Sequence, residues 1–212
     1  MPERGLFITL EGGEGAGKTT LAATLAAALK RDGREVVLTR EPGGTPNAEA
    51  LRALLVEGET GRWSPMAETL LMFAARLDHV ERLVKPALDR GAVVICDRFT
   101  DSTRAYQGAA GGVEAGRIDA VRMAALGAFE PDLTFIVDLD PAVGLGRTRT
   151  RGETETRFER QPDVFHTALR QAFLDIAADA PERCVVLDGA QPPEIVANAA
   201  RNALSERFGV LA

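Results

Sequence analysis

Residues 12–19 of the chain read Gly-Gly-Glu-Gly-Ala-Gly-Lys-Thr. Two glycines separated by four residues, with Lys-Thr directly after the second, have the spacing of a phosphate-binding loop. An apolar run of strand length at 6–10 precedes the loop, and leucines at helical spacing come after it. A strand, a glycine loop and a helix are the context that the motif requires, so the stretch predicts a site for nucleotide phosphates.

The chemistry of the loop results from its glycines. Without Cβ atoms, the backbone can turn its N–H groups inward toward phosphate oxygens, and the next helix adds the positive end of its dipole. Lys18 supplies a mobile positive charge, and the Thr19 hydroxyl can hold magnesium. The residues expected to bind the nucleotide here are Gly12, Gly13, Glu14, Gly15, Ala16, Gly17, Lys18, Thr19 and Thr20.

The composition is that of a soluble globular chain. The 212 residues are 45% apolar, contain no run of membrane-spanning length, and carry a net charge of −6, which argues against a general basic face for nucleic acid. The amino terminus leads straight into the first predicted strand, with no signal-peptide pattern. One domain, a cytoplasmic location and no membrane association are expected.

The cysteines and histidines predict no metal centre. Cys96 and Cys184 lie in apolar, strand-like runs, which favours buried thiols over a disulfide or a metal pair. His79 and His166 lie in helical patterns far apart in the sequence. No zinc ligand set is evident among them.

Short apolar segments alternate with helical patterns along the chain. After the first strand, further strands are expected at 35–39, 92–96, 133–138 and 184–187. Helices are expected at 66–90, 115–129, 162–178 and 193–207. This alternation predicts an α/β fold with a five-stranded parallel sheet flanked by helices.

Charged residues stand directly after several of the predicted strands. Arg40 and Glu41 come after the second strand, and Asp97 and Arg98 come after the third. Because ligands bind at the carboxyl ends of parallel strands, these side chains are expected beside the phosphate loop.

An arginine-rich segment, RTRTRGETETRFER, occupies 147–160. Gly152 is expected to break a helix there and leave a mobile loop. Alone, such a segment is typical of a solvated surface. Beside a phosphate loop it fits a lid that brings positive charge over the phosphates and excludes water.

Several motifs together resemble the thymidylate kinase family, in its bacterial form. They cover nearly the whole chain in order: EGGEGAGKTT at 11–20, TREPGGT at 39–45, LLMFAARLDHVE at 70–81, DRFTDSTRAYQG at 97–108, VDLDP at 137–141 and the arginine-rich segment. The resemblance implies an enzyme that uses ATP and Mg²⁺ to convert dTMP to dTDP, in dTTP biosynthesis. It further implies a three-layer P-loop kinase fold, one nucleoside-monophosphate kinase domain over 1–212 with a lid at about 147–160, and a homodimer.

The resemblance also implies roles for residues at the acceptor. Glu14 would accept a hydrogen bond from the deoxyribose 3′-hydroxyl, and Arg40 would bind the acceptor phosphate. Arg76 would read the thymine edge, and Arg98 would lie between the two phosphates. The nucleoside pocket would be lined by Thr103, Tyr106 and Gln107.

Catalysis, metal binding and the lid involve further positions in the same resemblance. The implied catalytic residues are Lys18, Glu41, Arg98 and Arg151. The metal would lie near Thr19 and Asp97. Gly15 stands where another branch of the family has an arginine in the loop. The positive charge near ATP would therefore come from the arginine-rich segment, and Arg147 and Arg149 would contact ATP.

Two neighbouring residues are candidates for covering the thymine base. Met72 stands four positions before Arg76, where the family usually has an aromatic residue, and Phe73 stands three before. Both positions share a helix face with Arg76. A flat ring suits a flat base, so Phe73 is preferred, with Met72 as the alternative.

Two other functions are weighed against this one. Another nucleoside or nucleoside-monophosphate kinase could use the same scaffold. A nucleotide-dependent switch protein is disfavoured, because the sequence has no Asn-Lys-x-Asp guanine-reading motif and no Asp-x-x-Gly switch after a strand.

Overall fold

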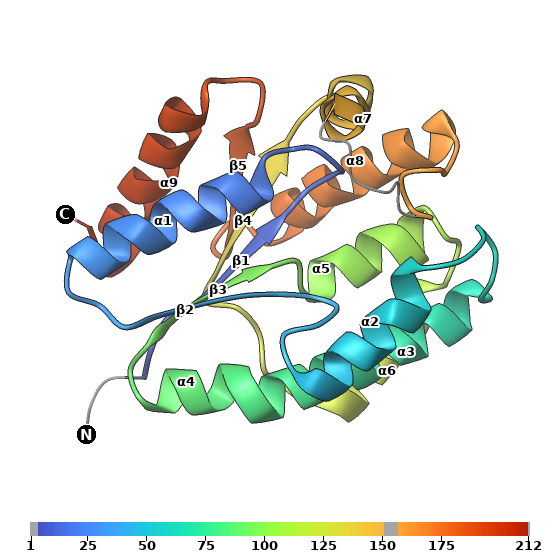
Figure 1. Ribbon diagram of the computed structural model, residues 1–212, viewed down its shortest axis with the longest axis horizontal. Coiled ribbons are helices and arrows are strands. Elements are labelled where there is room, and N and C mark those ends of the chain that lie inside the picture. The colour runs from blue at the N-terminus through green and yellow to red at the C-terminus, as the bar shows by residue number, and fades with distance from the viewer. Residues whose placement is uncertain (1–3, 151–156, 212) are drawn as a thin grey trace.

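A computed structural model of the chain describes residues 4–150 and 157–211. Five strands form one parallel sheet in the order β2-β3-β1-β4-β5, with β1 in the centre (Figure 1). Each predicted strand is present, with its bounds shifted by no more than one residue. The strands are β1 Phe7–Glu11, β2 Val36–Arg40, β3 Val93–Asp97, β4 Leu133–Asp138 and β5 Cys184–Asp188.

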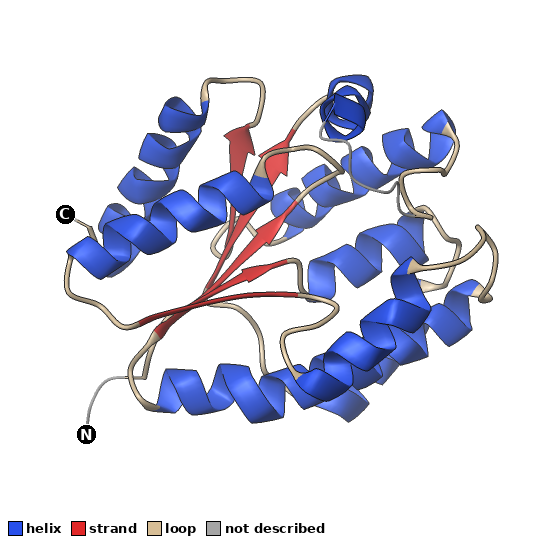
Figure 2. Cartoon of the chain, viewed as in Figure 1, coloured by secondary structure: helices blue, strands red, loops and turns tan. Residues whose placement is uncertain are grey.

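Helices cover both faces of this sheet (Figure 2). Two of the helical segments are π-helices, labelled η. In chain order the segments are α1 Lys18–Arg31, α2 Pro46–Val56, α3 Pro65–His79, η1 Val80–Val84, α4 Lys85–Asp89, α5 Thr100–Thr103, η2 Arg104–Ala109, α6 Ala115–Leu126, α7 Pro141–Thr150, α8 Asp163–Asp179 and α9 Pro193–Phe208.

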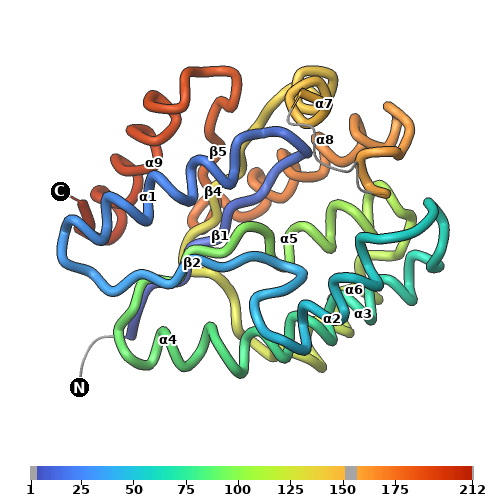
Figure 3. Tube along the Cα trace, in the orientation of Figure 1, coloured from blue at the N-terminus to red at the C-terminus, as the bar shows by residue number. Residues whose placement is uncertain are grey.

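The alternation of side chains along the strands produces three layers. Ile8 and Leu10 of β1 pack into an apolar cluster with α1 and α9, which run beside each other on one face (Figure 3). Phe7 points the other way, into a cluster with α3, α4 and α6. A third cluster joins α8 and η2 to β4 and β5. The predicted three-layer α/β fold is confirmed.

The helix predicted over 66–90 is interrupted. Ser64 accepts a hydrogen bond from the N–H of Ala67 and begins α3 one residue earlier, with Pro65 in its first position. The helix then widens into η1 before α4. Pro86 explains the break, because it has no N–H to donate to the carbonyl four residues back and its ring crowds that carbonyl.

The helix α2 was not predicted. It begins directly after the glycine turn of the TREPGGT motif, where the Thr45 hydroxyl accepts from the N–H of Ala48 and Pro46 occupies the first turn. A threonine directly before a proline is a start signal for a helix, so the sequence did carry the information. The helix α2 is important for the site because it packs on α3 and brings Arg52 to the larger cavity.

The phosphate loop and α7 touch backbone to backbone. A Cβ atom built on Gly15, which has φ +65°, would lie 2.0 Å from the carbonyl oxygen of Gly144. One built on Gly144 would lie 2.2 Å from the carbonyl oxygen of Glu14. The loop therefore fixes the position of the helix that begins the arginine-rich segment.

This contact is tested by two alanine substitutions in α7. Gly144→Ala should lower the free energy of unfolding by about 1–3 kcal/mol, because the new methyl group meets a backbone carbonyl that cannot move aside easily. Gly146→Ala is the matched control: nothing lies within 4 Å of its Cβ position. That variant should gain about 0.5–1 kcal/mol from helix propensity. Urea denaturation measures both, and equal stability of the two variants would contradict the contact.

Candidate active site

Lys18 is folded back onto the phosphate loop. Its Nζ donates to the carbonyl oxygens of Gly12 at 3.1 Å and Gly13 at 2.7 Å, and only 7% of the residue is exposed. Burial and the nearby charge of Arg98 lower the pKa of Lys18 to about 8. The ammonium group is thus poorly compensated by its present partners and is ready to turn toward an anion in the loop.

Arg98 joins the loop to the segment after β3. Its Nη1 donates to the Gly12 carbonyl at 3.0 Å, and its Nη2 donates to Oε2 of Glu14 at 3.1 Å. The Tyr106 hydroxyl donates to the other oxygen of Glu14 at 2.5 Å. Although burial opposes ionisation, Arg98 and Lys18 hold the pKa of Glu14 at about 2. The Glu14 carboxylate is therefore a fixed negative charge and a pure hydrogen-bond acceptor.

Glu11, which was not predicted as a site residue, holds the turn that carries Arg98. Arg98 has φ 71°, a left-handed conformation that is costly for a residue with a side chain. Directly after it, the N–H groups of Phe99 and Ser102 donate to Oε1 of Glu11 at 2.8 and 3.2 Å. Burial and the charge of Asp101 raise the pKa of Glu11 to about 7. The sequence signal that could have identified Glu11 is its place as a carboxyl group at the end of an apolar strand.

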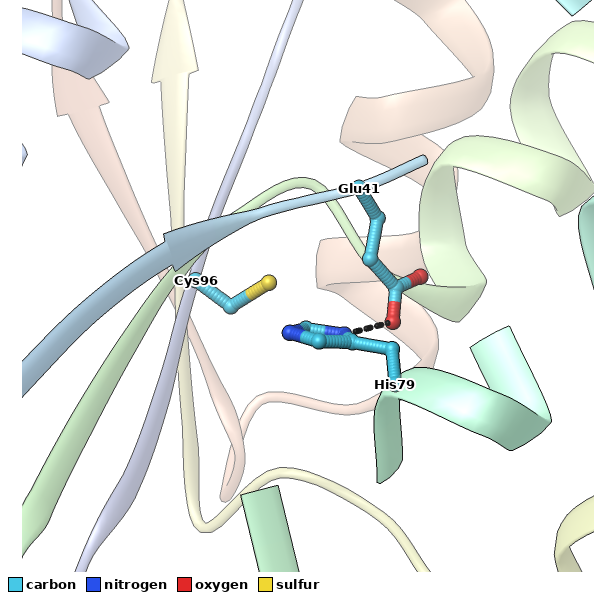
Figure 4. Close-up of side chains that lie close together, drawn as sticks. All are labelled: Glu41, His79 and Cys96. Atoms are coloured by element: carbon cyan, nitrogen blue, oxygen red, sulfur yellow. Dashed lines mark hydrogen bonds and ion pairs between the residues drawn. The ribbon is translucent and has the colours of Figure 1, made fainter. Parts of the chain in front are cut away.

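Glu41 lies in a buried cluster below the ends of β2 and β3. It accepts from Nε of Arg76 at 2.6 Å and is hydrogen-bonded to Nδ1 of His79 at 2.8 Å. The Cys96 thiol lies close to both side chains (Figure 4). Ligand atoms of Glu41, His79 and Cys96 fall within 4.8 Å of one another, a spacing that a metal ion could use.

The hydrogen bonds of this cluster already use its polar atoms. Glu41 is paired with Arg76, His79 Nε2 is bonded to the Thr39 hydroxyl at 2.8 Å, and the Cys96 thiol donates to the Arg98 carbonyl at 3.1 Å. Cys96 and Cys184 are both free and buried, as predicted. The cluster is therefore a brace that orients Glu41 and Arg76.

A cavity of about 730 Å³ opens at the phosphate loop, along the carboxyl edge of the sheet. Loop residues from Glu14 to Thr20 line one side, and residues located after β2 and β3 line another. The cationic lining residues that the structure describes are Lys18, Arg40, Arg52, Arg98, Arg147 and Arg149. This concentration of positive charge suits a polyphosphate.

A smaller cavity of about 110 Å³ adjoins it. Of the residues predicted for the nucleoside pocket, Arg76, Thr103, Tyr106 and Gln107 all line this cavity. Four side chains line both cavities: Glu14, Glu41, Arg52 and Arg98. The two spaces therefore meet at a charged boundary.

The structure differs from the sequence expectation at the base-covering residue. Met72 lines the smaller cavity, whereas Phe73 is not among its lining residues and is only 2% exposed. The Phe73 ring packs 4.7 Å below the guanidinium carbon of Arg76, in the core with Phe7. One residue along a helix turns a side chain by about 100°, which sends the larger ring to the sheet and leaves methionine at the cavity.

The predicted metal-binding pair and the first arginines of the predicted lid also lie at the larger cavity. The Thr19 hydroxyl donates to Oδ2 of Asp97 at 3.0 Å. Arg147 and Arg149 lie in the last turns of α7 rather than in a loop, and both line the cavity. Arg151 lies outside the described residues.

Sequence reasoning missed several lining residues, among them Arg52 and Phe158. Arg52 comes from α2 and donates to the Pro42 carbonyl at 2.8 Å. Phe158, in the arginine-rich segment, meets the Tyr106 ring edge-on at 5.4 Å. Both residue types could be read from the sequence. Whether the Arg52 and Phe158 side chains face the cavities, however, depends on how α2 and residues 157–161 pack.

A parallel sheet in this order, with the glycine loop after its central strand and arginines gathered at the same edge, defines the class: the chain is a P-loop kinase. Comparison with known proteins narrows the class. The model of the thymidylate kinase family matches residues 10–200. The chain belongs to the thymidylate kinase family, so the resemblance noted in the sequence is confirmed.

Individual relatives agree with this assignment. The thymidylate kinase of Caulobacter vibrioides is 51% identical over 207 residues, which covers 98% of this chain and 99% of that protein. That of Dinoroseobacter shibae is 51% identical over 197 residues, or 93% and 95% of the two chains. The crystal structure of thymidylate kinase from Ehrlichia chaffeensis superimposes with a TM-score of 0.79 at 33% identity, covering 95% of this chain and 99% of that one.

Among the described residues, no helix combines the length and apolarity needed to cross a membrane.

The lowered pKa of Lys18 predicts a proton linkage. Bound phosphates should raise this pKa again, so nucleotide binding at pH 8.5 should take up a proton, and affinity should fall as the pH rises above about 8. Calorimetric titrations with ATP in buffers of different ionisation enthalpy count the protons. Lys18→Arg is the control, because its charge does not titrate in this range. Equal uptake by the two proteins would contradict the linkage.

Proposed function

We propose that the chain transfers the γ-phosphoryl group of ATP directly to a phosphate oxygen of dTMP, with the donor phosphates in the larger cavity and the thymidine moiety in the smaller one. Membership of the thymidylate kinase family makes phosphorylation of dTMP the reaction of this enzyme. The observation that carries the assignment of the cavities is their shared boundary of Glu14, Glu41, Arg52 and Arg98. Two anionic phosphates must meet at such a boundary for transfer to occur.

Charge neutralisation is the main task of the residues at this boundary. The acceptor phosphate is already an anion at neutral pH, so the reaction needs alignment and positive charge more than a strong base. Lys18 turns from the loop carbonyls to the donor phosphates. Arg98 and Arg52 line both cavities, so Arg98 contacts donor and acceptor together and Arg52 holds the acceptor phosphate. Arg40, at the end of β2 beside them, holds the same phosphate.

Glu14, Glu41 and Tyr106 position the acceptor. The ionised Glu14 accepts a hydrogen bond from the sugar 3′-hydroxyl beside the Tyr106 ring, which narrows the space near the 2′ position. Glu41 holds Arg76 in place for the base edge through their buried ion pair. Thr103 supports the same guanidinium by accepting from Nη1 at 3.1 Å.

Magnesium fits the oxygen atoms at the loop. Thr19 and Asp97 offer a hydroxyl and a carboxylate, the hard ligands that Mg²⁺ prefers. The ion would supply neutralisation of the charge that develops on the donor phosphates.

We further propose that residues 1–212 form one kinase domain in which the segment at about 147–160 serves as the lid. The three apolar clusters all contain residues of the one sheet, which supports a single unit. Arg147 and Arg149 reach the larger cavity from one end of the segment. Arg151 remains the predicted contact to the transferring phosphate. A cytoplasmic enzyme fits substrates of this kind.

The acceptor is tested by a panel of nucleotides. With ATP and Mg²⁺, the protein should phosphorylate dTMP in strong preference to dCMP, dGMP and thymidine, measured by coupled ADP release. Lys18→Ala should abolish turnover while leaving the circular dichroism spectrum unchanged. A preference for another acceptor would favour a different nucleoside or nucleoside-monophosphate kinase, and ATP hydrolysis independent of any acceptor would favour a switch protein.

A homodimer is proposed through the face that α3 and α6 share. These helices pack on each other, and each exposes a large apolar side chain: Leu70 is 51% exposed and Met123 is 52% exposed. Apolar side chains from neighbouring helices form the kind of patch that a partner covers.

Sedimentation tests the dimer. The protein should sediment as a dimer at micromolar concentration, and Leu70→Glu should shift it toward monomer because a buried charge at the interface would lack a partner. Val164→Glu is the control, since Val164 is exposed on α8, away from this face. A wild-type protein that sediments only as monomer would refute the proposal.

A further inference from the structure

Gln107 lines the smaller cavity, but its amide nitrogen is engaged outside it. Nε2 of Gln107 donates to Oε1 of Glu68 at 2.5 Å, and both side chains are buried. An ionised carboxylate can only accept hydrogen bonds, so the nitrogen and not the oxygen of the amide must face Glu68. The chemistry of the partner therefore fixes which way the amide points.

Glu68 has a second buried contact, on its other carboxylate oxygen. Nη2 of Arg157 donates to Oε2 of Glu68, and Nε of Arg157 donates to the backbone carbonyl of Leu55 in α2. Arg157 is 2% exposed, and its guanidinium carbon lies 4.4 Å from the Phe158 ring. One carboxylate oxygen of Glu68 therefore faces a buried cation, and the other faces the Gln107 amide nitrogen.

Because Glu68 engages the amide nitrogen of Gln107, the amide carbonyl oxygen is the atom of this side chain that can bind a ligand. Within 4–150 and 157–211, Oε1 of Gln107 has no hydrogen-bond partner, although the side chain borders the cavity. Arg76 lines the same cavity and carries only N–H donors. The cavity thus presents donors from Arg76 and an acceptor from Gln107.

We propose that Glu68 is a positioning residue for the acceptor base: it holds the Gln107 amide so that the carbonyl oxygen faces the bound nucleotide. This inference rests on the proposed function. Donors beside an acceptor match a pyrimidine that has a carbonyl group next to a ring N–H, as thymine does. Cytosine has an amino group next to a bare ring nitrogen, the reverse pattern. Glu68, which is not among the lining residues of either cavity, therefore contributes to the choice of base.

Glu68→Gln tests this role. The new amide can donate as well as accept, so the orientation of Gln107 is no longer enforced. Steady-state kinetics should show the dTMP/dCMP ratio of kcat/KM falling by about tenfold, mainly through a higher KM for dTMP. Glu35→Gln removes a charge from a surface pair with Arg90 and should leave the ratio unchanged.

A double-mutant cycle separates positioning from a structural role. In a Gln107→Ala background, Glu68→Gln should cause no further loss of selectivity, because the amide that it orients is gone. Glu68→Asp serves as a second variant in case Glu68→Gln folds poorly. It keeps the charge facing Arg157 but shortens the reach to Gln107, so it should also lower the dTMP/dCMP ratio of kcat/KM.

Two results would overturn the role of Glu68. One is wild-type selectivity in Glu68→Gln and Glu68→Asp. The other is an additive loss in the Gln107→Ala background. A wild-type enzyme that does not phosphorylate dTMP would instead overturn the proposed function, so the two failures are distinguishable.

Discussion

The site depends on the way one guanidinium group is held. Arg98 lies just after the strand next to the centre of the sheet, and its side chain reaches across to the loop after β1, where it contacts the Gly12 carbonyl and the Glu14 carboxylate. Its left-handed backbone costs about 1–3 kcal/mol, which the hydrogen bonds of Glu11 to the next residues help to offset. Because Arg98 borders both cavities, the same constraint fixes how the two cavities are placed relative to each other.

Positive charge is concentrated around this group, and the structure compensates it with backbone carbonyls and buried carboxylates. Lys18 turns toward loop oxygens, Arg76 toward Glu41, and Arg98 toward Glu14. Each of these contacts uses only part of the hydrogen-bonding capacity of the cation. In the proposed reaction Lys18 gives up its loop carbonyls to reach the phosphates, whereas Arg98 has N–H groups left for them while it keeps its present contacts.

Much of this arrangement could be predicted from the sequence, because the residues at the carboxyl ends of parallel strands all meet at one edge of the sheet. The loop, Arg40, Glu41, Asp97 and Arg98 were found in that way. The features that could not be predicted depend on packing between helices. Whether Met72 or Phe73 reaches the cavity turns on a single residue of helical rotation, and the direction of Arg52 requires the unpredicted α2. Glu11 accepts from the backbone N–H groups of Phe99 and Ser102, and the proposed role of Glu68 runs through Gln107. No spacing rule in the sequence connects either carboxylate to those partners.

The contact between Gly15 and Gly144 also limits how a chain of this kind can diverge. A Cβ atom at Gly15 would meet the backbone carbonyl of Gly144, and one at Gly144 would meet that of Glu14, so neither position has room for a side chain unless α7 moves. An arginine introduced into the loop at position 15 would displace α7, and with it the two arginines by which this helix lines the larger cavity. A cation carried by the loop at position 15 therefore conflicts with the present placement of Arg147 and Arg149 at the larger cavity.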